Sequence, residues 1–228
     1  MLPSVIVLPH SWPSHGDLVA APLVLASRSP RRRELLGSIF DGVRVLPPPD
    51  AAEDPLDDLA DERDLQRRLK ATVARKAEQV AALLAEDAGD LPTTTEPWLV
   101  AADTTVVIEG PQTADGRRPP RSLGQPRDEE EAAHFLRRLS RSTHRVMTAV
   151  QLQRSGRRQT AIATTTVTFH DLSADRIAWY VGTGEPVGKA GGYAIQGLGS
   201  LLVERVEGSL SNVIGLPLEL FTRKAGRA

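Results

Sequence analysis

The sequence contains no cysteine among its 228 residues. Disulfide bonds, thiolate nucleophiles and cysteine-ligated metal centres are therefore excluded. Aromatic residues make up only 4% of the chain, and no apolar run approaches the ~20 residues that a membrane-spanning helix needs. An excess of charge of one sign is also missing, since 28 basic residues are balanced by 29 acidic ones. A broad nucleic-acid surface usually needs a strong basic excess, so we expect no stable nucleic-acid partner and no membrane contact.

The chain length fits one large domain or two small ones, and the composition is that of an ordinary globular protein. Residues 1–20 contain a short apolar piece that no Lys or Arg precedes, which is untypical of a signal peptide. We therefore expect residues 1–20 to form a mobile N-terminal extension and residues 21–228 to form a single domain. The lack of cysteine is typical of a cytoplasmic protein, which is the localisation we expect.

Segments with helical and strand periodicity alternate along the chain. The clearest helix is expected at about 60–86, where an apolar residue recurs every three or four positions. The segments 144–153 and 158–170 alternate in hydrophobicity, which predicts a β-hairpin. We further expect strands at 23–26, 98–110 and about 200–206, and helices from Pro30, from Asp128 to Leu139, from Ser173 to about Val181, and at about 216–224. Interspersed helices and strands predict an α/β domain with a mixed sheet.

A cluster of serines and arginines follows the expected strand at 23–26. Ser29 is suited to cap a helix whose first residue is Pro30. A strand that leads into a helix N-terminus gathers backbone N–H groups at one point, which favours an anion there. Further donors would come from the side chains of Ser27, Arg28, Ser29, Arg31 and Arg32. The alternative is a basic, solvated face on a short helix.

One acid interrupts an otherwise apolar segment, because Asp103 lies within "VAADTTVV". A lone buried carboxylate costs several kcal/mol unless it is paired or bound to a metal. One interpretation is that the strand ends at Ala102 and that Asp103 merely caps a turn. The other is a metal ligand or general base at a strand end, where open α/β sheets place their ligands.

Seven glycines lie within residues 182–199. A P-loop is excluded because the glycine spacing is one residue short and Ala190 stands where Ser or Thr would bind magnesium. We expect the glycines to let the backbone approach a ligand closely, with Lys189 and Gln196 as polar contacts. The alternative is a flexible linker.

Five stretches, taken in order, resemble the Maf family, also called septum formation proteins, which are nucleoside triphosphate pyrophosphatases. The stretches are "LASRSPRRRELL", "AADTTVV", "LGQPRDEEEAAHFLRRLS", "THRVMTAVQL" and "GEPVGKAGGYAIQGLGSLLVERVEGSLSNVIGLPL". The resemblance runs from about Pro22 to the expected C-terminal helix. It implies an α/β domain with an elongated mixed β-sheet, in which helices form two lobes around a deep cleft. The family is similar in architecture to the inosine triphosphate pyrophosphatases.

The resemblance implies cleavage of a nucleoside triphosphate between its α and β phosphates, giving the monophosphate and pyrophosphate. Asp103 matches the family's catalytic position and would accept a proton from the attacking water. The positions associated with choice of the base are matched by Arg31, Thr104 and Gln196. The phosphate side of the cleft would be lined by Ser27, Ser29, Arg32, Lys76 and Lys189. A divalent metal, magnesium or else manganese, would be bound by Asp103 and Glu53.

The forms "SPRR", "ADT" and "IQG" are similar to the branch that acts on dTTP and UTP, and modified pyrimidine nucleotides are further candidate substrates. Two positions depart from the family pattern, because Gln125 replaces a lysine and Gly188 replaces an aspartate. Two alternatives therefore stay beside the main interpretation: a catalytically impaired nucleotide- or nucleic-acid-binding regulator of cell division, and a 7-methyl-GTP pyrophosphatase. Family members are often dimers, so the resemblance also admits a homodimer.

Overall fold

The computed structural model describes residues 5–7, 9, 12–50, 56, 58–86 and 96–223. In these residues, eight strands form one mixed sheet in the order β1-β7-β6-β4-β2-β3, with β5 also paired to β4 and β8 also paired to β7. The strands are β1 (Val5–Val7), β2 (Leu23–Ala26), β3 (Arg44–Val45), β4 (Trp98–Glu109), β5 (Pro120–Leu123), β6 (Thr143–Arg154), β7 (Arg157–Phe169) and β8 (Val203–Glu207). β2 runs parallel to β4, whereas β6 is antiparallel to β4 and to β7. The expected α/β domain with a mixed sheet is confirmed.

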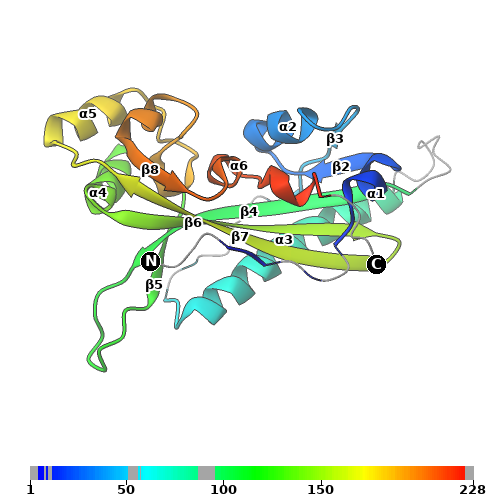
Figure 1. Cartoon of the computed structure of the whole chain (residues 1–228), viewed down its shortest axis with the longest axis horizontal. Coiled ribbons are helices and arrows are strands. Elements are labelled where there is room, and N and C mark those ends of the chain that lie inside the picture. Colours follow the sequence, from blue (N-terminus) through cyan, green and yellow to red (C-terminus); the bar gives the residue numbers. More distant parts are fainter. Residues whose placement is uncertain are drawn as a thin grey trace.

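Helices lie on both sides of this sheet (Figure 1). The α-helices are α1 (His15–Val19), α2 (Pro30–Gly37), α3 (Glu62–Glu86), α4 (Glu129–Leu139), α5 (Ala174–Gly182) and α6 (Leu210–Ile214), and the 3-10 turns are η1 (Ala190–Gly192), η2 (Leu198–Leu202) and η3 (Leu218–Leu220). The long helix α3 covers one side. On the opposite side, α1 and α2 gather near one end of the sheet and α4 and α5 near the other, with α6 between them (Figure 1). No helix in the described part of the chain is long and apolar enough to cross a bilayer.

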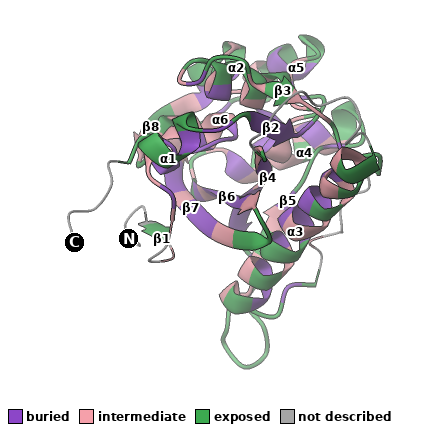
Figure 2. Ribbon diagram, turned by 90° about the vertical axis from the view of Figure 1, so that its right-hand side faces the viewer, coloured by how far each residue is buried: buried purple, intermediate pink, exposed green. Residues whose placement is uncertain are grey.

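Buried residues run along the strands of the sheet and recur on the helices that cover it (Figure 2). On the α3 side, Leu65, Leu69 and Val73 pack on β4 and its neighbours. The opposite side carries one cluster that joins Leu36 of α2 to Phe221 near the C-terminus, and a second cluster around α4 and α5. Because β4 is covered on both sides, its residues are apolar without the alternation that a half-exposed strand shows.

The acid in this apolar segment, Asp103, lies in the interior of β4 and not at its end. One edge of β4 pairs with β6 along most of its length. Along the other edge, β2 ends opposite Ala101, and the antiparallel strand β5 pairs only with Val106 to Glu109. No described strand therefore pairs with residues 102–105 on that edge. The expected placement of Asp103 at a strand end is therefore wrong, because β4 continues past it and only the neighbouring strands β2 and β5 stop short of this stretch. The role of Asp103 as a general base or metal ligand stays a prediction.

The two ends of the described chain also differ from expectation. In place of a helix at about 216–224, only the short turn η3 follows α6 in the described residues. Leu216, Leu220 and Phe221 are all fully buried in one core cluster, so tertiary packing, and not helix propensity, sets the path of this segment. The region before β2, which we expected to be mobile, packs on this C-terminal segment. Leu18 is fully buried there, and Trp12 Nε1 donates a hydrogen bond to Leu220 O at 2.8 Å. The division of the chain at residue 21 stays a prediction.

Candidate active site

A cavity of about 650 Å³ lies beside the unpaired stretch of β4. Its walls come from the β2–α2 junction, from α3, from the segment 188–196 and from the end of α6. The predicted site residues that line it are Ser27, Ser29, Arg31, Arg32, Lys76, Thr104, Lys189 and Gln196. Of the other two, Asp103 contacts Lys76 at the cavity wall, and Glu53 lies outside the described residues. Tertiary structure thus brings together groups that are far apart in the sequence.

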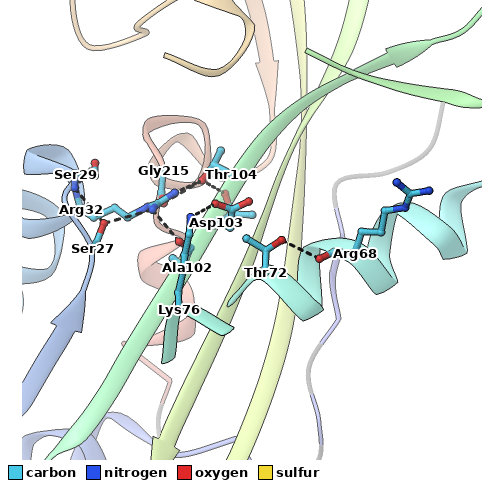
Figure 3. A network of polar contacts seen from close by, with 11 residues as sticks. Ser27, Ser29, Arg32, Arg68, Thr72, Lys76, Ala102, Asp103, Thr104 and Gly215 are labelled. Atoms are coloured by element: carbon cyan, nitrogen blue, oxygen red, sulfur yellow. Dashed lines mark hydrogen bonds and ion pairs between the residues drawn. The ribbon is translucent and has the colours of Figure 1, made fainter. Parts of the chain in front are cut away.

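An ion pair joins α3 to β4 at this cavity, since Lys76 Nζ lies 2.5 Å from Asp103 Oδ1 (Figure 3). Each side chain is only 9% exposed. The helical period places Lys76 on the buried stripe of α3, about one turn after Val73. The pleat of β4 turns the Asp103 side chain toward the α3 side of the sheet. The pair compensates for the burial of both charges. It also fixes Oδ1, while Oδ2 accepts no hydrogen bond from the described residues.

Arg32 ties α2 to β4 and to the chain after α6 (Figure 3). Its Nε donates to Gly215 O at 2.9 Å, and its Nη1 donates to Ala102 O at 2.8 Å, beyond the end of β2. Its Nη2 donates to Thr104 Oγ1 at 3.0 Å. The guanidinium group therefore satisfies a carbonyl oxygen on the edge of β4 where no described strand pairs with residues 102–105, and it holds one wall of the cavity in position.

The N-terminus of α2 opens on the cavity in the way that the sequence predicts. Ser29 Oγ accepts a hydrogen bond from Arg32 N at 3.4 Å, and Ser27 Oγ accepts one from Ser29 N at 3.1 Å. Pro30 is the first residue of the helix. Arg28 donates to two carbonyl oxygens of the proline-rich loop after β3, at 3.0 Å and 2.9 Å, and so holds that loop beside the cavity.

Two further cations, Arg31 and Lys189, act on each other across the cavity. Burial lowers the pKa of the Arg31 guanidinium, although the charge of Glu185 opposes that effect. Burial also lowers the pKa of the Lys189 ammonium, and repulsion from Arg31 lowers it further. The buried Nε of Arg31 has no hydrogen-bond partner among the described residues. An anionic ligand would relieve the repulsion and supply acceptors.

The rest of the cavity wall is largely apolar, and its members are Val106, Val146, Ala190, Ala194, Ile195, Val213 and Ile214. Tyr193 joins this part, and its hydroxyl is hydrogen-bonded to His144 Nε2 at 2.9 Å. Burial lowers the pKa of His144 to about 3, so the imidazole is neutral at physiological pH. One part of the cavity therefore suits an anion and the other an uncharged, largely apolar group.

The family model of Maf-like proteins matches residues 22–226. The chain belongs to the Maf-like protein family. It is 41% identical over 199 residues to a dTTP/UTP pyrophosphatase of Bacillus velezensis, which covers 86% of this chain and 90% of the relative. Relatives of the same name from Myxococcus xanthus and Escherichia coli O157:H7 are 42% and 41% identical, each over 86% of this chain and 87% of the relative.

In this Maf-like protein, the two positions that depart from the family pattern lie side by side in the cavity wall. Gln125 and Gly188 both line the cavity, and Gln125 Oε1 is 4.0 Å from the place that a Cβ atom at Gly188 would occupy. Gly188 has a φ of +69°, a conformation that glycine adopts easily. Neither position carries a charge, and Lys189 is the cation that lines the cavity next to Gly188.

Sequence reasoning missed two residues that shape this Maf-like site, Glu185 and Tyr180. The Glu185 carboxylate accepts a hydrogen bond from Tyr180 Oη at 2.8 Å and organises the backbone that carries Gln196. Neither residue stands out in the sequence, because a glutamate in a turn and a tyrosine in an amphipathic helix are both common. Only their contact in three dimensions shows a role.

Proposed function

We propose that this protein hydrolyses dTTP and UTP to the nucleoside monophosphate and pyrophosphate. Relatives that carry the name dTTP/UTP pyrophosphatase match the chain over 87–90% of their length, which supports the proposal. The observation that carries it is the position of Asp103, whose carboxylate is held by Lys76 at a cavity with further cations in its wall. The expected choice of Asp103 as the reactive acid agrees with this arrangement.

In the proposed reaction, Asp103 accepts a proton from the attacking water. The Oδ2 atom has no hydrogen bond within the described residues and can take the proton, while Lys76 Nζ holds Oδ1 at 2.5 Å. The water oxygen forms a bond to the α phosphorus and stays in the nucleoside monophosphate, while the bond between the α phosphorus and the bridging oxygen breaks and its electron pair leaves with pyrophosphate. A positioned general base of this kind typically contributes about 10²–10⁴-fold to the rate.

The triphosphate would lie against the cationic part of the cavity. Lys189 and Arg32 supply charge, and the N-terminus of α2 supplies backbone N–H groups near Ser29. These groups are in place before the substrate binds, so little reorganisation is needed as charge moves to the leaving pyrophosphate. Lys76 and Ser27 line the same part and complete the expected phosphate contacts.

The base would be chosen by Arg31 and Gln196, next to the apolar wall. Both side chains line the cavity, and the described residues give no hydrogen bond to the Gln196 amide. Thr104 has a different position, because its hydroxyl already contacts Arg32 at 3.0 Å and Thr148 at 2.9 Å. We therefore assign direct contacts with the base to Arg31 and Gln196. Thr104 would instead hold Arg32, and with it the cavity wall that Arg32 supports.

A divalent cation fits this site if the nucleotide supplies part of its ligands. Within the described residues, no three His, Asp or Glu side chains come together as a metal-binding group. Asp50 lines the cavity and would offer a carboxylate, and the expected ligand Asp103 would lie next to the ion, with its Oδ2 toward the attacking water. Mg²⁺ is commonly held by one or two carboxylates together with substrate phosphates, so this donor set suits Mg²⁺ or Mn²⁺. When bound, such an ion neutralises part of the phosphate charge.

The proposal is tested with dTTP, UTP, CTP and 7-methyl-GTP, each with Mg²⁺ or Mn²⁺, by measuring released pyrophosphate and phosphate. We expect pyrophosphate from dTTP and UTP, with slower release from the other two. Asp103→Asn is expected to lower the rate by at least roughly 100-fold, whereas Asp171→Asn, at an exposed aspartate, keeps full activity. Retained pyrophosphate release in the Asp103 variant would overturn the assigned role.

The same panel decides between the proposal and its alternatives. Faster turnover of 7-methyl-GTP than of dTTP would favour the methylated purine nucleotide as substrate. Binding of nucleotides without release of any product would favour a regulator that has lost catalysis. The homodimer and the cytoplasmic localisation stay predictions, which sedimentation and cell fractionation can test.

A further inference from the structure

One short stretch of the cavity wall, residues 194–199, is held by two side chains that lie behind it. The Glu185 carboxylate accepts hydrogen bonds from the backbone N–H groups of Leu198 at 2.9 Å and Gly199 at 2.8 Å. Tyr180 Oη donates to Glu185 at 2.8 Å and accepts from Ala194 N at 3.1 Å. The stretch is thus anchored at both of its ends by one connected pair of side chains, which we name the Glu185–Tyr180 clasp.

The glycines of this stretch leave the space that the clasp side chains occupy. A Cβ atom at Gly197 would lie 2.1 Å from Glu185 Oε2, and a Cβ atom at Gly199 would lie 2.7 Å from Tyr180 Oη. Both approaches are closer than any larger residue allows, so the close contact explains why glycine stands at these positions. The clasp and the stretch therefore fit each other as one unit.

The residues between the two anchored ends of this stretch line the cavity. Ile195 and Gln196 lie between Ala194 and Leu198, and both line the cavity. Gln196 is an exposed side chain without a hydrogen bond in the described residues, so its backbone sets where its amide can reach. Loosening either anchor would let Gln196 move relative to a bound base.

The charge of Glu185 adds a second connection to the site. Burial raises the pKa of the Glu185 carboxyl, but its hydrogen bonds with Gly199, Tyr180 and Leu198 outweigh that effect and lower it overall. The carboxylate is therefore ionised at neutral pH. Its charge acts on Arg31 and Lys189, the two cations that repel each other across the cavity.

We infer that Glu185 is a positioning residue for nucleotide selection, which acts by fixing Gln196 through the clasp and by balancing the charge of Arg31. The inference rests on the proposed function, because it explains how Gln196, the proposed contact of the base, is held in the same cavity. Glu185 touches no reacting atom in this scheme. Its loss should therefore change which nucleotide binds more than how fast a bound nucleotide reacts.

The test uses Glu185→Gln and Tyr180→Phe in the full chain. The glutamine keeps the size of the side chain but places an NH₂ group among backbone N–H donors, and the phenylalanine removes one hydroxyl. Glu204→Gln, at an exposed glutamate of β8, is the matched control. Equilibrium binding of dTMP, UMP and GMP measures selection without turnover, and initial rates with dTTP and UTP separate KM from kcat.

Both clasp variants are expected to weaken dTMP and UMP binding roughly tenfold, as the loss of a hydrogen bond to a charged group would do. GMP binding should change little, so that the preference for pyrimidines falls. KM for dTTP should rise by a similar factor while kcat stays within about threefold. The control variant should match the wild type. Unchanged pyrimidine binding in both clasp variants, with wild-type thermal midpoints, would overturn the inference.

Failure of this inference and failure of the proposed function give different results. If the wild type releases no pyrophosphate from dTTP or UTP, the proposed function is wrong, yet binding of dTMP and UMP still decides the inference. Hydrogen exchange adds a direct readout of the clasp. Amides of Ala194, Leu198 and Gly199 should exchange at least tenfold faster in Glu185→Gln, and unchanged exchange would contradict the clasp even if the variant proves less stable.

Discussion

Replacing Lys76 by methionine should destabilise the fold by about 3 kcal/mol, because it leaves the Asp103 carboxylate buried without its partner. Both side chains are only 9% exposed, and the ion pair spans 2.5 Å. Methionine keeps most of the apolar stem of lysine, so lost packing contributes little. In a protein of this length, 3 kcal/mol corresponds to a fall of roughly 6–12 °C in Tm.

A double-mutant cycle with Asp103→Asn tests the origin of this effect. The asparagine removes the charge, so the double variant should be more stable than the Lys76→Met single variant by about 2 kcal/mol. Urea unfolding at neutral pH measures all three variants against the wild type. Lys70→Met is the matched control, because Lys70 lies on the same helix but is exposed, and its substitution should change stability by less than about 0.5 kcal/mol.

Two results would refute the reasoning behind this cycle. The first is a Lys76→Met variant that unfolds at the same urea concentration as the wild type. The second is a double variant that is less stable than either single variant. Either result would mean that the Asp103 carboxylate does not depend on Lys76, and the proposed orientation of the general base would then lose its support.

Three further predictions concern the cavity wall and its surroundings. Arg32→Lys should destabilise the fold by about 2 kcal/mol in urea unfolding, because an ammonium group cannot replace a guanidinium fork that joins α2 to β4. Gly197→Ala should lower stability by roughly 1–3 kcal/mol through overpacking, since the new Cβ would lie 2.1 Å from Glu185 Oε2, and calorimetry can measure the change. Between pH 7 and pH 5, His144 alone should remove about 2 kcal/mol of stability. Its pKa is about 3 in the folded protein against 6.5 ordinarily, so the unfolded chain binds the proton first, and His144→Phe should lose this part of the pH dependence.

Each of these predictions has a result that contradicts it. Wild-type stability in Arg32→Lys would show that its hydrogen bonds are not needed to hold α2 on β4. An unaffected Gly197→Ala variant would show that Glu185 does not occupy the space beside this glycine. Equal pH dependence of the wild type and His144→Phe would show that the imidazole is not buried in its neutral form.

Local patterns in the sequence predicted the elements that carry the site. The serine cap and proline start of α2 were predicted correctly, because a helix N-terminus depends on neighbouring residues alone. The period of α3 was also visible, and it places Lys76 on the buried stripe. The isolated acid at Asp103 was recognisable as a group that needs a partner. The C-terminal helix was predicted wrongly, because the apolar residues after α6 follow a path set by burial in the core cluster with Leu36, which local propensity does not show.

The sequence by itself therefore determined the α/β class, the family and the types of side chain that the site uses. Only the tertiary structure decided that Lys76 is the partner of Asp103, that β4 is open in its middle, and that Glu185 supports the segment with Gln196. The physical reason is range. Propensity, capping and periodicity act between residues a few positions apart, whereas these contacts depend on where separate strands end and how helices pack across the sheet.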